Sequence, residues 1–520
     1  MGIFFASFKW WEQEEQAGAY DFRLMQYVQQ TVCEGGMKLA VLLEAHYTPP
    51  WVFVRFPDAG QVDARNNTMQ EISFSHAGAM HLLHSWHEAA LASLAAGDAA
   101  CIHSVQPTFN NEVETKYTQV GALCFWAACC APSRPGLPCP PGRAGSSGRL
   151  AFVQPVCTLH RAAAALLSPT AHAPPPPVLQ TKDAPRDYSP RAIKLFQEYF
   201  QNVHGSLQHW NRRWGANFSS WSAVRPPKFF QHLRHFNDTA TNLFYWDFQH
   251  FRHQRIHAVH ESACMHIAAH GFRCILHFPE FMTSADAIYA SGVVFTLAAS
   301  PWLDYVVVDS NFMTTSMHPN DVRVVTLLVA AMKPFGKPVF FEGAFERISD
   351  PALHQRAVAL TVAAGTHGMG FTNWLDMIGP EFFGKALHGT YASRSAHAPA
   401  VAILTPYRSY WAHKGVPGQA DGVTLQAKDA QQDLLFQCLD KVEAAVPSLD
   451  GLQIFAVPAM LLPVLHDFQQ VWYLEPDVLL SGDAKTVDAV RERASALGVA
   501  FHSCRARQAP PTVLPECCPS

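Results

Sequence analysis

The chain has 520 residues, of which 49% are hydrophobic and 12% aromatic, and its formal net charge is −4. Charged residues make up only 15% and basic residues are not in excess, so the composition does not favour nucleic acid as a partner. No apolar run reaches the ~18 residues of a membrane span, and the first residues lack the pattern of a secretory signal. We therefore expect no membrane partner and, by default, a cytoplasmic protein.

The beginning of the chain alternates between strand and helix patterns. The sequence predicts strands at residues 2–8, 37–48 and 100–109, and helices at residues 20–32 and 77–94 between them. Strands and helices that alternate at this spacing indicate a parallel α/β fold.

Residues 121–181 interrupt this alternation with a composition rich in Cys, Pro, Gly and Ala. Such a composition has few ways to bury a regular element. We expect a disordered, low-complexity insertion, although a structureless loop of this length is uncommon inside a compact domain. Retained intron sequence in a gene model would look the same.

Regular patterning resumes at Asp187. The segment 188–215 is predicted to be helical, with Ser189 as N-cap and Pro190 at the first helical position. A second helix is predicted at residues 240–270 and carries many histidines: His250, His253, His257, His260 and His266. Some are four residues apart, but no carboxylate or cysteine completes a metal set at a clear spacing. We interpret them as a polar helix face and expect no metal.

Four further strands are predicted at residues 273–281, 303–311, 337–343 and 368–374. They complete most of an α/β fold of the (β/α)8 TIM barrel type, which we assign to residues 1–396. The alternation then restarts, and we predict a smaller open-sheet α/β domain of flavodoxin-like, trimerisation type at residues 397–504. Residues 505–520 are predicted to be a disordered tail.

The 13 cysteines are odd in number and show no paired spacing typical of zinc. Cys33, Cys264, Cys274 and Cys438 lie on apolar-patterned segments. We predict that these are inert core thiols and that the chain is not stapled by disulfides. No nucleotide-binding loop occurs either, so no cofactor is expected.

Two glutamates follow strand patterns that end in polar residues. Glu112 ends the sequence FNNE beside Asn111, and Glu342 ends VFFE before Gly343. In an α/β barrel the catalytic groups lie where the strands end, and retaining glycoside hydrolysis needs two carboxyl groups on facing positions. Position alone does not separate the pair from other carboxylates near strand ends: Glu44, Glu114, Glu280, Asp309 and Glu346.

Several segments resemble clan A glycoside hydrolases, and the fuller likeness is to family 42, the β-galactosidases. WWEQEEQAGAYDF is similar to that family's glutamate-rich turn and helix start, and EAHYTPPWV to its strand that ends in paired prolines. YSPRAIKLFQEYFQNVHGSLQHWNRRWGANFSSWSAVRPP resembles its helix after the acid/base residue. THGMGFTNWLDMIGPEFFGKALHG and PAVAILTPYRSYW resemble its eighth strand and the start of its second domain.

The resemblance implies a retaining β-galactosidase with Glu112 as acid/base and Glu342 as nucleophile. Asn111 and Trp374 would line the sugar subsite, Trp374 by stacking on the apolar face of the sugar. A carbohydrate substrate and a homotrimer are the implied partners, and no cofactor is implied.

The chain also departs from the family pattern. It starts inside what resembles the second strand, so we expect the first strand and helix of the barrel to be missing, and Glu112 leads directly into the insertion. Three alternatives follow: another clan A β-glycosidase, a catalytically inactive carbohydrate-binding barrel, and a defective gene model of an active enzyme.

Overall fold

A computed structural model describes most of the regular elements of the chain. The described residues are 3–63, 66–108, 187–227, 239–279, 291–310, 327–343, 361, 365–371, 401–409, 430–446, 452–476, 478–505 and 512–514. The predicted insertion at 121–181 lies outside them. None of the helices in these ranges is long and apolar enough to cross a membrane.

The first sheet is parallel and has the order β1-β2-β5. Its strands are β1 (Ile3–Lys9), β2 (Lys38–Glu44) and β5 (Ile102–Thr108). They alternate with α2 (Arg23–Glu34) and α4 (Ala77–Ala96), while α1 (Trp10–Gln13) and α3 (Pro50–Arg55) are single short turns. These elements confirm the strands and helices predicted for residues 2–109, within a few residues at their ends.

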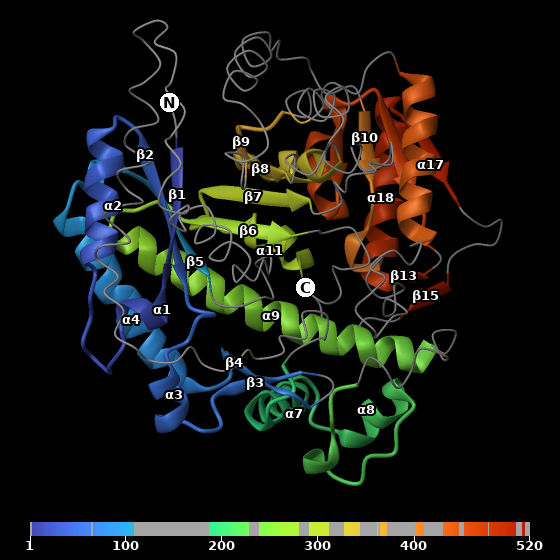
Figure 1. Cartoon of the computed structure of the whole chain (residues 1–520). Helices are drawn as coiled ribbons and strands as arrows, with labels where there is room; N and C mark the ends of the chain where they lie inside the picture. Colours follow the sequence, from blue (N-terminus) through green and yellow to red (C-terminus); the bar gives the residue numbers. More distant parts are fainter. Residues whose placement is uncertain are drawn as a thin grey trace, which may run out of the picture.

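A second parallel set has the order β6-β7-β8-β9. It consists of β6 (Ile275–Pro279), β7 (Tyr305–Ser310), β8 (Val339–Gly343) and β9 (Gly368–Phe371). A parallel bridge joins Val105 of β5 to Cys274, and the Val105 amide donates to the Arg273 carbonyl at 2.8 Å. The seven strands therefore run in one direction in the order β1-β2-β5-β6-β7-β8-β9 (Figure 1).

Helices cover one face of this array and side chains meet on the other. The long α9 (Thr239–Ala269) runs beneath the strands, and its carboxyl end lies beside α4 (Figure 1). Apolar side chains of α2, α4 and α9 share one core with alternate residues of the strands. On the opposite face Ile3 of β1 packs against a cluster that includes Tyr305 and Phe340. The array is therefore curved enough for its first strand to reach the cluster formed by β6, β7 and β8.

A third parallel sheet has the order β11-β10-β12-β14. It comprises β10 (Val401–Leu404), β11 (Gln453–Phe455), β12 (Gln470–Leu474) and β14 (Ala500–Cys504), with α17 (Ala430–Ala445) and α18 (Ser481–Leu497). A small parallel pair, β13 (Val478–Leu480) and β15 (Thr512–Leu514), lies nearby. Val401 and Ile403 belong to the same core as α9. The fold is thus mixed α/β, and the domain boundary at 396/397 stays a prediction.

The segment predicted as one helix at 188–215 forms two. Helix α7 (Pro190–Val203) begins as predicted, with the Ser189 hydroxyl accepting from the Ala192 amide at 3.2 Å. Helix α8 (Leu207–Trp214) has its own cap, because the Ser206 hydroxyl accepts from the His209 amide at 3.3 Å. The prediction of one continuous helical segment was wrong because Gly205 and Ser206 favour a break over continuation.

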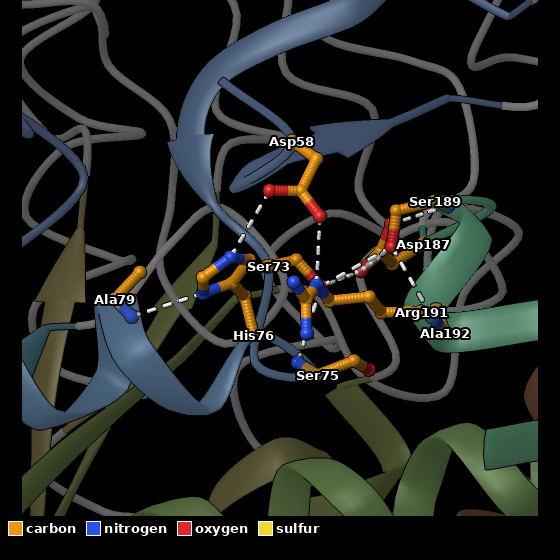
Figure 2. A network of polar contacts seen from close by, with 9 residues as sticks. All are labelled: Asp58, Ser73, Ser75, His76, Ala79, Asp187, Ser189, Arg191 and Ala192. Atoms are coloured by element: carbon orange, nitrogen blue, oxygen red, sulfur yellow. Dashed lines mark hydrogen bonds and ion pairs between the residues drawn. The ribbon is translucent and has the colours of Figure 1, made fainter. Parts of the chain in front are cut away.

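Sequence patterns did not reveal an antiparallel hairpin of β3 (Gly60–Val62) and β4 (Thr68–Ile72). Asp187 ties this hairpin to α7 (Figure 2). Its carboxylate accepts from the Val62 amide at 3.2 Å, the Ser73 hydroxyl at 2.5 Å and the Ser189 amide at 2.8 Å. Next to it, Asp58 pairs with Arg191 at 2.9 Å.

Within the described ranges, three disulfides correct the prediction of inert core thiols. They join Cys33 to Cys101, Cys264 to Cys274, and Cys438 to Cys504. The partners of Cys33 and Cys438 lie 68 and 66 residues away along the chain. Local apolar patterning identified these positions as buried, but it carries no information about which cysteine packs against which.

Replacement of Asp187 by asparagine should loosen the attachment of the hairpin to α7. The new side-chain amide would place a donor where the carboxylate accepts from the Val62 and Ser189 amides and from the Ser73 and Ser189 hydroxyls. Unsatisfied buried donors cost about 1–3 kcal/mol each. We expect Asp187→Asn to lower the free energy of unfolding by about 2 kcal/mol, measured by urea denaturation.

The neighbouring Asp58→Asn is the matched control, because the Asp58 side chain is 54% exposed and its ion pair is screened by water. We expect a much smaller change. An equal loss of stability in both variants would contradict the anchoring role of Asp187.

Candidate active site

The candidate site lies at the carboxyl edge of the seven parallel strands. In the first sheet, strand pairing aligns Lys9 with Glu44, and Glu44 with Thr108. In the second set, Asp309 is aligned with Glu342, and Glu342 with Gly370. Because all seven strands run in one direction, these rows of polar residues end at the same edge, which is where parallel α/β folds place their ligands.

Aromatic side chains form a floor on the same face, below this edge. The His103 ring of β5 stacks on Tyr305 of β7 at 4.7 Å between centroids, and it meets Phe340 of β8 at 5.7 Å. Phe340 also contacts the ring of His367 at 5.2 Å. Tyr305 and Phe340 precede Asp309 and Glu342 by four and two positions along their strands. The floor thus spans the strands that carry the polar rows.

Glu44 is a buried carboxyl at the end of β2, with its side chain only 2% exposed. Burial raises the pKa of Glu44 to about 7, although a hydrogen bond from Ser7 and the charge of Lys9 oppose the shift. Lys9 itself forms an ion pair with Glu12 at 3.0 Å, so its positive charge acts on both Glu12 and Glu44. Near neutral pH Glu44 therefore exists in both protonation states, and its neutral form can donate a hydrogen bond.

His46 follows Glu44 by two residues, and its pKa is shifted in the opposite direction. Burial, together with the charge of Lys9, lowers the pKa of His46 to about 3. The imidazole is therefore neutral at all physiological pH values. Lys9 also lies over the ring of Tyr47, 5.1 Å from its centroid. The ends of β1 and β2 thus present one ammonium group beside a neutral imidazole and a protonatable carboxyl.

The structure describes one of the predicted site residues, Glu342, and not the other three. Glu342 lies in β8, one residue before its carboxyl end and in register with Asp309. Glu112 and Asn111 lie outside the described residues, as does Trp374; β5 ends at Thr108, four positions before Glu112. The pairing of Glu112 with Glu342 is therefore still a prediction.

Of the five other carboxylates predicted near strand ends, the structure describes two. Glu44 and Asp309 belong to strands that end at the same edge as Glu342, whereas Glu114, Glu280 and Glu346 lie outside the described residues. Lys9 and His46 were missed by sequence reasoning. The signal available for Lys9 was its position at the end of a predicted strand, and for His46 its place two residues after Glu44.

Three of the α9 histidines have separate neighbours along the helix. His257 pairs with Glu261 at 3.1 Å, and the His260 ring contacts the Ile256 carbonyl at 2.8 Å. His250 contacts Gln254 at 2.9 Å. Within the described ranges, the groups with donor atoms close enough to share a metal lie away from the carboxyl edge.

Comparisons with known proteins agree with this architecture. Residues 179–376 match the family model Glyco_hydro_42, described as β-galactosidase. The β-galactosidase from Rahnella sp. R3 aligns with a TM-score of 0.62 at 12% identity, over 96% of this chain and 66% of that chain. The exo-carrageenase GH42 from Bacteroides ovatus aligns with a TM-score of 0.61 at 12% identity, over 99% and 66%.

A third similar structure is the catalytic domain of β-amylase from Paenibacillus polymyxa. Its TM-score is 0.52 at 14% identity, over 76% of this chain and 92% of that chain. No curated protein sequence matches the chain significantly. The chain spans 66% of the length of the Rahnella and Bacteroides enzymes.

At these identities the structural likeness establishes the fold, a mixed α/β arrangement shared with catalytic domains of glycoside hydrolases. The family match narrows the comparison to one segment: residues 179–376 are similar to the glycoside hydrolase family 42 domain, and this range includes Glu342 and Trp374 but not Glu112.

The raised pKa of Glu44 predicts a specific pH dependence of stability. Because the folded protein holds this proton up to about pH 7 and an unfolded glutamate releases it near pH 4.5, the stabilising contribution is complete at acid pH. It is lost as the pH rises through 7. Relative to Glu44→Gln, the wild-type protein should lose about 3 kcal/mol between pH 4.5 and 8.

Urea denaturation of both proteins across this pH range tests the expectation. Glu198→Gln is the control, because Glu198 is a 46%-exposed glutamate on α7. This variant should change the free energy of unfolding little, because the Glu198 ion pair is exposed. A Glu44→Gln difference that does not vary with pH would show that Glu44 titrates normally.

Proposed function

We propose that the chain is a retaining glycoside hydrolase that releases terminal β-D-galactose. The observation that supports this most directly is the position of Glu342 near the end of β8, in register with Asp309, inside the range that matches family 42. Glu342 is the proposed nucleophile and Glu112 the proposed acid/base residue. Asn111 and Trp374 are proposed to bind the sugar.

In the proposed reaction Glu112 donates its proton to the glycosidic oxygen while the Glu342 carboxylate attacks the anomeric carbon. The bond to the leaving group breaks as a glycosyl ester forms on Glu342. Water, deprotonated by Glu112, then attacks the same carbon from the opposite face and releases the sugar with its original configuration. This route requires the two carboxyl groups to lie about 5 Å apart.

The described edge offers further contacts for a sugar. Glu44 is buried beside the end of β2, and its pKa of about 7 allows the neutral acid to donate to a hydroxyl. Lys9 is held next to it by the pairing of β1 with β2. We propose that this pair binds hydroxyl groups of the substrate, on the side of the edge opposite Glu342.

A closed (β/α)8 barrel is the architecture that we propose around this edge. The contact of Ile3 on β1 with the cluster of β6, β7 and β8 supports closure, although the described hydrogen-bonded order ends at β1 and β9. The sheet of β10, β11, β12 and β14 would belong to a second domain at 397–504. By the resemblance to family 42, we propose that this domain assembles a homotrimer.

A second candidate is another β-glycosidase of the same clan. The relative from Bacteroides ovatus is titled an exo-carrageenase, not a β-galactosidase. Related folds thus differ in substrate, and the choice of galactose depends on contacts to one hydroxyl. Initial rates on a panel of nitrophenyl β-glycosides would rank the sugars.

The test of the mechanism uses nitrophenyl β-D-galactoside and two variants. Glu342→Ala should reduce kcat roughly a thousandfold or more, because the covalent step is lost. Azide should restore turnover and give a galactosyl azide of inverted configuration. Glu112→Ala with azide should give the product of retained configuration, since its nucleophile is intact.

Glu198→Gln is the matched control and should keep the wild-type rate. Full activity of Glu342→Ala would rule out the assigned role. Sugar binding without turnover in the wild-type protein would instead identify a catalytically inactive carbohydrate-binding domain.

A further inference from the structure

Three metal-ligating side chains meet where α4 passes the carboxyl end of α9. One oxygen of the Glu88 carboxylate lies 3.0 Å from His270 Nε2. The other oxygen pairs with His266 Nε2. The donor atoms of the three residues all lie within 4.8 Å of one another. This place is on the helical layer and is separate from the carboxyl edge of the strands.

The two helices present these groups because of their spacing. His266 and His270 are four residues apart at the end of α9, so both project from one side of the helix. Their rings lie 5.4 Å apart at an interplanar angle of 71°, and each Nε2 pairs with a different oxygen of Glu88. The carboxyl end of a helix also carries partial negative charge and favours a cation.

The three side chains lie partly at the surface, although the His266 Nε2 atom itself is covered. Glu88 is 52% exposed, His266 43% and His270 21%. An exposed carboxylate between two imidazoles contributes little to stability as an ion pair alone. Zinc holds nitrogen and oxygen ligands at about 2.0–2.2 Å, so tetrahedral ligand atoms lie roughly 3–3.5 Å from one another. The donor atoms here lie within 4.8 Å of one another, so binding an ion requires side-chain rotations that bring them closer.

We propose that Glu88, His266 and His270 form a binding site for Zn²⁺ or a similar first-row dication, with water in the fourth position. Two imidazoles and one carboxylate suit these ions better than Mg²⁺ or Ca²⁺, which prefer oxygen ligands. The bound ion would join α4 to the end of α9, next to the segment that enters β6. The helix histidines interpreted from sequence as a polar face thus include one metal ligand, completed by a glutamate from another helix.

Binding of Co²⁺ to the full-length, chelator-treated protein tests the proposal, because Co²⁺ substitutes for zinc and reports its ligands by visible absorption. We expect a saturable d–d spectrum without a thiolate charge-transfer band, which separates this site from the cysteines. Glu88→Gln, His266→Ala and His270→Ala should each weaken Co²⁺ binding roughly tenfold or more.

His257→Ala is the matched control, because it removes another His–Glu pair of α9 that lacks a second imidazole. It should bind Co²⁺ as the wild-type protein does. Circular dichroism would verify that each variant is folded, and Zn²⁺ should raise the Tm of the wild-type protein but not of Glu88→Gln. Unchanged affinity in all three ligand variants, or a thiolate band that accounts for all the bound Co²⁺, would overturn the proposal.

Discussion

The common direction of seven strands is the constraint on which the candidate site depends. The two strand sets are joined by one parallel bridge between Val105 and Cys274. If this junction were antiparallel, Glu44 and Glu342 would lie at opposite edges. Because it is parallel, the ends of β2 and β8 share one edge, while helices cover the outer face. Long-range strand pairing, rather than any local motif, therefore brings the polar residues together.

Sequence patterning predicted the strands and main helices well because each is a local feature. Ser189 followed by Pro190 marks a helix start, and β1 and β2 are short, mainly apolar runs. The hairpin of β3 and β4 was missed because its strands have three and five residues and contain no strong period. The disulfides and the Glu88 cluster were missed because each depends on side chains from separate elements.

Two glutamates show that burial changes the chemistry available to one residue type. Glu44 and Glu88 are the same residue type, on β2 and α4. Glu44 is buried and holds its proton to about pH 7, whereas Glu88 is half-exposed and pairs with two imidazoles. The first suits hydrogen bonding to a substrate, and the second suits a cation. Sequence position near a strand end identified Glu44 as a candidate but could not supply its environment.

The central claim, that Glu342 is the nucleophile of a retaining hydrolase, can be tested by trapping its ester. A 2-deoxy-2-fluoro-β-D-galactoside with a good leaving group slows breakdown of the glycosyl-enzyme, so the intermediate accumulates. Mass spectrometry of the treated protein should show one added fluorogalactosyl group, on the peptide that contains Glu342. A label on another carboxylate such as Asp309, or no label in a protein that hydrolyses galactosides, would contradict the account.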